Sequence, residues 1–323
     1  MLIRMVCPAP PGSLYGNRVT ALRWTRILRS LGHRITVAGD YDGRPCDLLI
    51  ALHARKSAGA VFQFREKHPG LPVVVALTGT DLYQDLRRYG TTARVLDAAD
   101  RIVALQPLAV AELALSLRDK VRVIYQSAEP TRSVGKHSRS FFDVCVAGHL
   151  RYVKDPFRTA YSVRRLPPAS RIRVFQAGTP IDASAARMAA AEQARNPRYH
   201  FLGPLSRTAT RRLIARSRVL VLSSRMEGGA NVISEAIVDG TPVIASRIPG
   251  SVGLLGDDYA GYFPAGDTER LRELLLRTES DTSFYRLLRQ QCASRARLFR
   301  PDEELKRWRS LLRELPAARQ TRK

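Results

Sequence analysis

Residues 218–246 read RVLVLSSRMEGGANVISEAIVDGTPVIAS and contain a strand, a helix and a second strand in succession. The apolar run 218–224 predicts a buried strand, and the segment 242–246 predicts the next one. Between them a helix is predicted to begin near Asn231, because apolar residues then recur at helical spacing: Val232, Ile233, Ala236 and Ile237. A strand–helix–strand unit of this length is typical of a parallel sheet.

The same alternation covers most of the chain. Strands are predicted at 2–7, 34–39, 46–54, 72–79, 100–106 and 121–127, and again at 143–150, 172–178, 199–203, 218–224, 242–246 and 261–264. The polar stretch 128–142 separates the two series and is typical of a linker. We therefore expect an α/β protein with two doubly wound Rossmann-like domains facing across a cleft. The predicted boundaries are 1–135 for the first domain, 141–297 for the second, and 298–323 for a C-terminal helix and tail that packs back towards the first.

The composition limits the classes of protein to be considered. The 323 residues include 53 basic and 29 acidic side chains, which give a formal net charge of +24. Such a charge attracts anionic ligands, but the basic residues are scattered without interleaved aromatic residues, so no nucleic-acid partner is expected. No apolar stretch is long enough to span a membrane, so no integral membrane association is expected. Four widely spaced cysteines predict neither a zinc site nor a disulfide framework, and they favour a cytoplasmic location.

The segment MEGGANVISEA at 226–236 is the first candidate site, because two acids frame a glycine pair at a predicted helix start. Gly228 and Gly229 let the backbone approach a ligand closely, and the start of a helix favours phosphate. The carboxylates of Glu227 and Glu235 suit the vicinal hydroxyls of a sugar or ribose. The alternative is an ordinary glycine turn that leaves Glu235 on a solvated helix face.

A second candidate follows the strand predicted at 143–150, in the segment AGHLRYVKDP. Arg151 and Lys154 lie at the carboxyl end of that strand, where two cations can neutralise a diphosphate leaving group. Asp155 and Pro156 are predicted to be the N-cap and first residue of a helix. The alternative is that both cations are ordinary surface residues of an arginine-rich chain.

The first domain carries its candidates after three strands. Gly16, Asn17 and Arg18 open a helix after the first strand, where they can hold an anion, although Asn17 can equally be a helix N-cap. His53 follows the third strand and is a base, an anion contact or a structural residue. Thr80 and Asp81 follow the fourth strand. No G-x-G-x-x-G follows the first strand, which removes the main support for an NAD-linked enzyme.

No metal cofactor is expected. The segment Asp40-x-Asp42 is interpreted as turn chemistry, because it lies between two short predicted strands. The charge of a leaving group must then be handled by arginine, lysine and helix dipoles.

Together these motifs resemble the GT4 family of GT-B glycosyltransferases. Glu227 and Glu235 match the E-x7-E motif of that family, and Lys154 matches its diphosphate-binding lysine. The run from Gly148 is similar to the G-R-L…K segment, with His149 in place of arginine, so that Arg151 takes the role of that arginine. The segments YHFLG at 199–203 and GTPVIAS at 240–246 also resemble the family.

The family resemblance implies a nucleotide-sugar donor and assigns the residues of the second domain. Arg151, Lys154 and Glu227 are then catalytic. The donor is bound by Gly148, Arg151, Lys154, Leu202, Glu227, Gly228, Gly229, Ala230, Asn231, Val232 and Glu235.

Four segments are similar to a narrower group, the selenosugar synthases of selenoneine biosynthesis. They are PAPPGS-x-x-GNRVTALRW from residue 8, YDGRPCDLLIALHARKSA from 41, ALTGTDLY from 76 and VIYQSAEP from 123. This resemblance implies UDP-N-acetylglucosamine or UDP-glucose as donor and selenophosphate as acceptor, with formation of a carbon–selenium bond. The acceptor is then bound by Gly16, Asn17, Arg18, His53, Thr80 and Asp81. The alternative is a conventional GT4 hexosyltransferase that acts on a hydroxyl.

Overall fold

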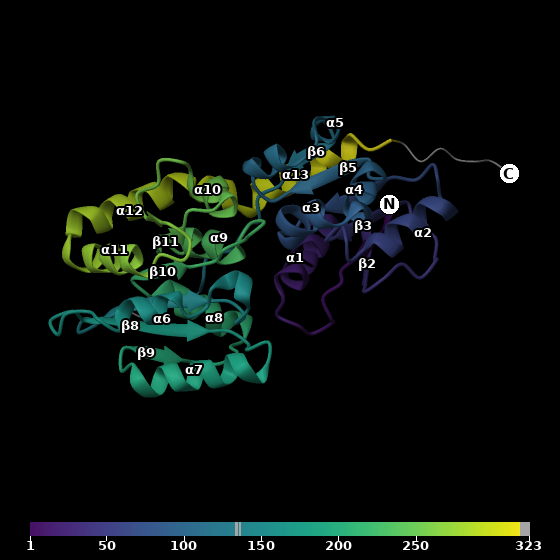
Figure 1. The fold of residues 1–323 in the computed structure, drawn as a ribbon. Coiled ribbons are helices and arrows are strands. Elements are labelled where there is room, and N and C mark those ends of the chain that lie inside the picture. The colour runs from purple at the N-terminus through teal and green to yellow at the C-terminus, as the bar shows by residue number, and fades with distance from the viewer. Residues whose placement is uncertain (133–134, 136, 317–323) are drawn as a thin grey trace. The chain divides into compact units, whose positions relative to one another are not determined.

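The computed structural model describes residues 1–132, 135 and 137–316. The chain forms two units, one made of Met1–Gln126 with the chain from Pro301 onward, and the other made of Ser127–Arg300. Figure 1 shows that each unit is a sheet with helices on its faces. Within the described residues each sheet has six strands, and all the strand pairs are parallel. The predicted class, two doubly wound α/β halves, is confirmed.

The sheet of the first unit has the strand order β2-β1-β3-β4-β5-β6. The strands are β1 (Leu2–Val6), β2 (Arg34–Ala38), β3 (Leu48–Leu52), β4 (Val73–Ala76), β5 (Arg101–Ala104) and β6 (Val121–Val123). The helical elements are α1 (Gly16–Ser30), α2 (Ala58–Lys67), the π-helical turn η1 (Asp81–Asp85), α3 (Leu86–Arg88), α4 (Gly90–Asp97), η2 (Pro107–Glu112), α5 (Leu115–Arg118) and α13 (Pro301–Arg313). The strand order reverses between β1 and β3, and in such sheets ligands bind at this switch point, beyond the carboxyl ends of the strands.

The core of the first unit includes the last helix of the chain. Every residue of β3 is buried, as expected for a strand covered on both faces. Trp24 of α1 and Trp308 of α13 are fully buried and meet edge to face, with their ring centroids 4.8 Å apart. The carboxylate of Glu304 accepts hydrogen bonds from Trp24 Nε1 at 2.7 Å and from Arg23 Nε at 3.0 Å. Since α13 supplies both apolar and polar contacts, it is an integral part of this core.

The sheet of the second unit has the strand order β12-β11-β10-β7-β8-β9. The strands are β7 (Phe142–Ala147), β8 (Ile172–Ala177), β9 (Tyr199–Phe201), β10 (Val219–Leu222), β11 (Val243–Ser246) and β12 (Tyr262–Phe263). The helical elements are η3 (Tyr152–Lys154), α6 (Arg158–Val163), α7 (Ala183–Arg195), α8 (Arg207–Arg216), α9 (Asn231–Val238), α10 (Pro249–Leu255), α11 (Thr268–Ser280), α12 (Thr282–Arg295) and η4 (Ala296–Phe299). The switch point lies between β7 and β10, so the loops that follow these two strands lie next to each other.

The chain passes from the first unit to the second just before the segment predicted as a linker. Asp239 holds the start of that segment, because its carboxylate accepts from Thr131 N at 2.7 Å and Oγ1 at 2.6 Å, and it also pairs with Arg211 at 2.9 Å. Residues 133, 134 and 136 of the predicted linker lie outside the described residues.

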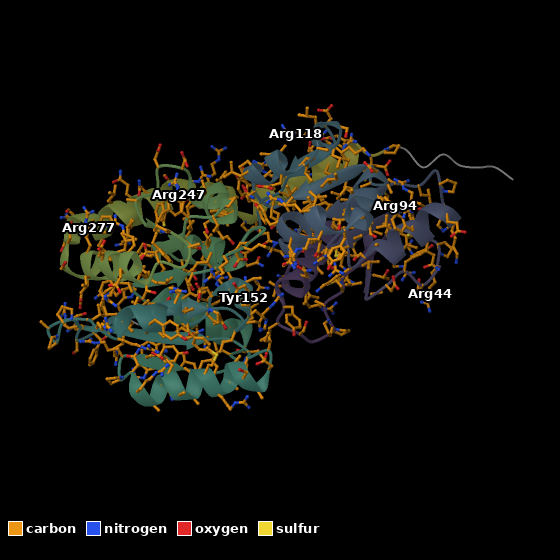
Figure 2. The ribbon with its side chains drawn as sticks, in the orientation of Figure 1. Arg44, Arg94, Arg118, Tyr152, Arg247 and Arg277 are labelled. Carbon is orange, nitrogen blue, oxygen red and sulfur yellow. The ribbon has the colours of Figure 1, made fainter. Side chains whose placement is uncertain are left out.

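Positive charge is spread over both units. Figure 2 labels Arg44, Arg94 and Arg118 on the first unit and Arg247 and Arg277 on the second. Within the described part of the chain, no helix has the length and apolarity needed to cross a lipid bilayer.

Candidate active site

The loop after β7, residues 148–155, is held close to the end of β8. Gly148 N donates to Ala177 O at 2.9 Å. Gly178 is required on the other side of this contact, because a Cβ there would lie 1.9 Å from the carbonyl oxygen of Gly148. The ends of the two neighbouring strands are therefore closer than any side chain at position 178 would allow.

The same loop also docks on the segment that follows β10. Arg225 N donates to Val153 O at 2.8 Å, and Ser223 Oγ donates to Asp155 O at 2.9 Å. These contacts bring the ammonium of Lys154 within 2.5 Å of Glu227 Oε1. The pair is largely shielded from solvent, with side chains 29% exposed for Lys154 and 9% for Glu227. A cation and a carboxylate predicted from two distant segments thus meet at the carboxyl edge of the sheet.

Glu227 is fixed by two further contacts. The hydroxyl of Ser224 donates to the oxygen that also binds Lys154, at 2.5 Å. Gly250, at the start of α10, lies so close that a Cβ on it would be 2.1 Å from Glu227 O. The carboxylate is therefore preorganised by its neighbours before any ligand arrives.

Asp155 has a different role from the one predicted. It has φ +43°, in the left-handed region, and α6 begins only at Arg158 with Phe157 as its N-cap. Its carboxylate instead accepts from Arg158 Nε at 3.0 Å and lies 3.4 Å from the guanidinium of Arg225. The prediction of an Asp155–Pro156 helix start was wrong, because aspartate tolerates the left-handed region and two arginines stabilise it there.

Helix α9 begins at Asn231, as the sequence predicted. Its N-cap, Ala230, has no side chain able to cap the helix, so the positive end of the helix dipole is not compensated by a capping side chain. Glu235, one turn further, is 7% exposed, and one oxygen lies 3.7 Å from Arg207 of α8. The alternative that placed Glu235 on a solvated face is therefore wrong.

The structure places the predicted donor residues in three loops at the carboxyl edge of the second unit's sheet, of which those after β7 and β10 are neighbours and the one after β9 lies two strands from β7. Gly148, Arg151 and Lys154 follow β7, whereas Leu202 follows β9, where its N–H donates to Gln176 O at 2.8 Å. The remaining residues lie between β10 and the first turns of α9: Glu227, Gly228, Gly229, Ala230, Asn231, Val232 and Glu235.

Sequence reasoning missed Arg225. Its guanidinium lies 5.4 Å from the ring centroid of Tyr152 and 3.4 Å from Asp155 Oδ2, and it therefore joins the two loops. Its position directly after a predicted strand, two residues before Glu227, was the signal that could have identified it.

In the first unit, Gly16, Asn17 and Arg18 form the first turn of α1. Tyr15 is the N-cap, so the alternative role of Asn17 as N-cap is wrong. Arg18 Nε is buried, and among the described residues it has no hydrogen-bond partner. A buried guanidinium N–H without a partner at a helix start is suited to an anion.

His53, Thr80 and Asp81 come together where β3 and β4 end. His53 Nε2 lies 3.0 Å from Thr80 Oγ1, and Asp81 is fully buried. Burial lowers the pKa of His53, against the opposing effect of the neighbouring Asp81 carboxylate. The imidazole is therefore neutral near pH 7. No cluster of three or more histidine, cysteine or acidic residues suited to a metal ion is found in the described ranges.

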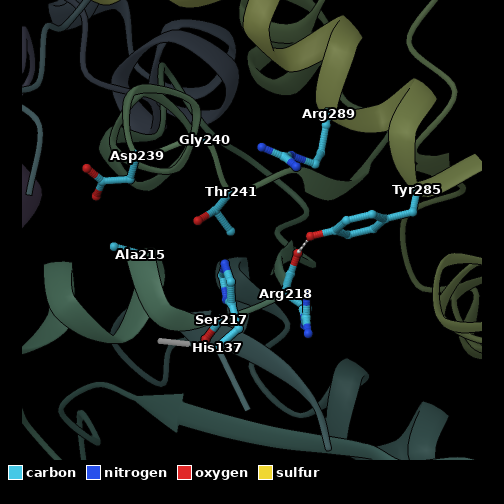
Figure 3. A pocket seen from close by; sticks show the side chains of 9 residues that line it. All are labelled: His137, Ala215, Ser217, Arg218, Asp239, Gly240, Thr241, Tyr285 and Arg289. Carbon is cyan, nitrogen blue, oxygen red and sulfur yellow. Dashed lines mark hydrogen bonds between the residues drawn. The ribbon is translucent and has the colours of Figure 1, made fainter. Parts of the chain in front are cut away.

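A small cavity of about 150 Å³ lies at the opposite edge of the second unit, where β10 and β11 begin (Figure 3). Its hydroxyl groups already donate to main-chain oxygens: Thr241 to Ile214 O, Ser217 to Leu213 O and Tyr285 to Arg218 O. The other lining residues are His137, Ala215, Asp239, Gly240 and Arg289. This cavity is separate from the loops that follow β7 and β10, and its hydroxyl groups serve the fold.

Comparison with known proteins identifies the relatives of these units. Residues 129–299 match the profile of the family described as glycosyl transferases group 1. HepE from Anabaena, solved with UDP and glucose, aligns over 98% of this chain and 100% of its own, with a TM-score of 0.77 and 16% identity. Sucrose-phosphate synthase from Thermosynechococcus elongatus aligns over 97% of this chain and 98% of its own, with a TM-score of 0.80 and 14% identity.

A third similar structure is the pneumococcal O-GlcNAc transferase GtfA, solved with UDP and GlcNAc. It aligns over 91% of this chain and 59% of its own, with a TM-score of 0.64 and 16% identity. No significant match was found among curated protein sequences. At these identities the structural matches establish the GT-B fold.

Proposed function

Because this chain belongs to the group 1 glycosyl transferases, we propose that it transfers a hexose from a UDP-sugar, either UDP-N-acetylglucosamine or UDP-glucose. The observation that carries this proposal is the meeting of Lys154 and Glu227 at 2.5 Å beyond the ends of β7 and β10. A nucleotide sugar needs cationic groups for its diphosphate and carboxylates for its hydroxyls, and this edge presents both. HepE, which shares the fold, was solved with UDP and glucose.

Each group of the second unit has a defined task in this proposal. Lys154 and Arg151 neutralise the diphosphate as the bond to the sugar breaks, and the amino end of α9 adds the positive end of its dipole. Glu227 binds hydroxyls of the donor sugar, and Glu235 binds those of the ribose. The donor diphosphate and sugar replace the Lys154–Glu227 contact, so Lys154 exchanges a carboxylate for phosphate oxygens and Glu227 exchanges an ammonium for hydroxyl donors.

The proposed acceptor is selenophosphate. Its selenium attacks the anomeric carbon, the carbon–oxygen bond to UDP breaks, and UDP leaves with that electron pair. Water then cleaves the phosphorus–selenium bond, and the products are a selenosugar and phosphate. The segments quoted from residues 8, 41, 76 and 123 support this acceptor. Gly16, Asn17 and Arg18 are proposed to bind it together with the cluster at His53.

The location proposed for this reaction is the cytoplasm, because Cys7, Cys46, Cys145 and Cys292 are all buried and unpaired. Neither a metal ion nor a cofactor is part of the proposal. The second candidate function, transfer of a hexose to a hydroxyl, uses the same donor site and differs only in its acceptor.

The test measures UDP release from each UDP-sugar, with selenophosphate present, omitted or replaced by simple alcohols. We expect selenophosphate-dependent release and a product whose mass contains selenium. If UDP is released only with alcohols, the second function is correct. If no acceptor promotes release, while UDP also fails to raise the melting temperature, the donor site itself is wrong.

A further inference from the structure

The cluster at the ends of β3 and β4 is built around the carboxylate of Asp81. This carboxylate accepts N–H groups from Ala54 at 3.1 Å, Thr78 at 2.9 Å and Gly79 at 2.8 Å. These donors belong to the loops after two neighbouring strands, so one side chain fixes both loops. Because Asp81 is fully buried and its oxygens are occupied by main-chain donors, it does not face a substrate.

His53 lies between these loops in an uncommon backbone conformation. Its φ is +69°, an uncommon left-handed value for a residue other than glycine. Its Nδ1 accepts the N–H of Lys56 at 3.4 Å, and a main-chain N–H can only donate. In a neutral ring the proton therefore lies on Nε2, which donates to Thr80 Oγ1 at 3.0 Å.

The charged groups around the ring have opposite effects on the pKa of His53. The carboxylates of Asp81 and Asp85 lie 4.0 Å and 3.9 Å from the two ring nitrogens, and Asp85 is paired with the guanidinium of Arg55 at 2.8 Å. Both carboxylates raise the pKa of His53, whereas burial, Lys56 and Arg55 lower it, and burial is the largest effect. The ring is therefore neutral, with the proton on Nε2 and with Nδ1 accepting the N–H of Lys56.

One hydrogen-bonding group remains for a ligand. Thr80 Oγ1 accepts the proton of His53, and within the described part of the chain its hydroxyl has no other partner. Thr80 is half-buried, so its own O–H can donate to a bound molecule. Lys56 N–H thus donates to His53, and His53 donates to Thr80. These hydrogen bonds run in one direction and leave the hydroxyl proton of Thr80 for a bound ligand.

We propose that this cluster is a hydrogen-bond donor for an acceptor substrate that arrives already ionised, a phosphate-type oxyanion, and that it takes no proton from the acceptor. Thr80 contacts the oxyanion, while Asp81 and His53 are positioning residues that orient its hydroxyl. This inference rests on the proposed function, since it assigns the acceptor class of the same transferase. A hydroxyl acceptor would need a base, and this cluster provides none.

The first test determines the protonation state and tautomer of His53 directly and does not depend on catalytic turnover. In the 15N spectrum of the full-length protein at pH 7, His53 should show the neutral Nε2–H tautomer. Titration with inorganic phosphate should shift the His53 signals in the wild type and leave them unchanged in Thr80→Val. A protonated ring, an Nδ1–H tautomer or a phosphate-insensitive wild type overturns the proposal.

The second test uses the transfer reaction with selenophosphate. Thr80→Val should raise the KM for selenophosphate about 10–100-fold, because it removes a hydrogen bond to a charged group. His53→Gln should lower kcat by no more than about tenfold, since the amide of glutamine can still donate to Thr80. Loss of about 10²–10⁴ in kcat, with removal of a limb from the pH profile, would identify His53 as a base and overturn the proposal.

A matched control is His68→Gln, which removes another histidine of this unit that is hydrogen-bonded to a hydroxyl, Tyr41 OH at 2.9 Å. It should leave the KM for selenophosphate unchanged. The two tests fail separately. If phosphate shifts the His53 signals but selenophosphate gives no turnover, only the proposed function is wrong. If turnover occurs with a protonated His53, only this inference is wrong.

Discussion

Replacing Lys154 by methionine removes one positive charge and keeps most of the side-chain volume. In the proposed reaction this charge stabilises the diphosphate as it leaves, so the loss falls on the transition state. Removing one preorganised electrostatic contact of this kind costs about 10²–10³ in rate. We therefore expect kcat to fall by about that factor in a UDP-release assay, with a smaller change in the KM for the UDP-sugar.

The same substitution has a separate and smaller effect on stability. Glu227, whose side chain is 9% exposed, keeps the hydroxyl of Ser224 but loses its ammonium partner at 2.5 Å. Leaving a buried charge without its partner costs about 1–3 kcal/mol, and the 29% exposure of Lys154 favours the lower end because water can replace the ammonium. A loss of about 1 kcal/mol lowers the melting temperature by about 2–4 °C. Adding Glu227→Gln to the Lys154→Met variant should recover part of the lost stability.

Arg173→Met is the matched control for this experiment. Arg173 pairs with Asp143 at 2.8 Å and is also 29% exposed, but both residues lie near the start of their strands, away from the loops after β7 and β10. It should lower the melting temperature to a similar extent and leave kcat within about twofold. Near-normal kcat in Lys154→Met, or an equal loss of kcat in Arg173→Met, would refute the role of Lys154.

Three further predictions concern other parts of the second unit, and the control for one of them lies in the first unit. Glu235→Ala should raise the Kd for UDP about 10–100-fold in calorimetry, because ribose hydroxyls lose a charged partner; an unchanged Kd would contradict this. Gly250→Ala should lower kcat about 10²-fold by displacing Glu227, whereas Gly59→Ala, which has nothing within 4 Å of its added Cβ, should not. Burial opposes ionisation of Glu192, but hydrogen bonds from two arginines and an asparagine lower its pKa to about 2. Its depressed pKa contributes about 3 kcal/mol to the free energy of unfolding, which is present above about pH 4.5 and is lost as pH falls towards 2. Glu192→Gln should therefore flatten the plot of the free energy of unfolding against pH in this range.

The strands and the start of α9 could be predicted from the sequence because they depend on local patterns. Apolar runs alternate with helical periodicity along both halves. Among the described residues, the twelve strands fall within the predicted segments, except that β7 begins one residue earlier, at Phe142. Asn231 was correctly predicted as the helix start because a glycine turn is followed directly by apolar residues at helical spacing.

Two of the errors and omissions arise from contacts between residues far apart in the sequence, and the third arises largely from hydrogen bonds with nearby main chain. Asp155 followed by proline has the local signature of a helix N-cap, but Arg225, seventy positions away, draws its carboxylate into another role. The direct pairing of Lys154 with Glu227 was not predicted either, since the sequence assigned them to different parts of a ligand. Asp81 was predicted as a substrate contact on its position after a strand, and only the structure shows that its oxygens bind main-chain N–H groups.

The position of α13 has a consequence for how the chain is synthesised. Trp308 and Glu304 complete the core around Trp24, yet they leave the ribosome about 280 residues after it. Until then the face of α1 that carries Trp24 lacks its cover, whereas Ser127–Arg300 is one continuous segment that can fold as soon as it has emerged. The unit made first is therefore the one completed last. A ribosome that stops before residue 301 releases a chain in which the face of α1 that carries Trp24 is uncovered, and such an apolar surface is suited to recognition by chaperones.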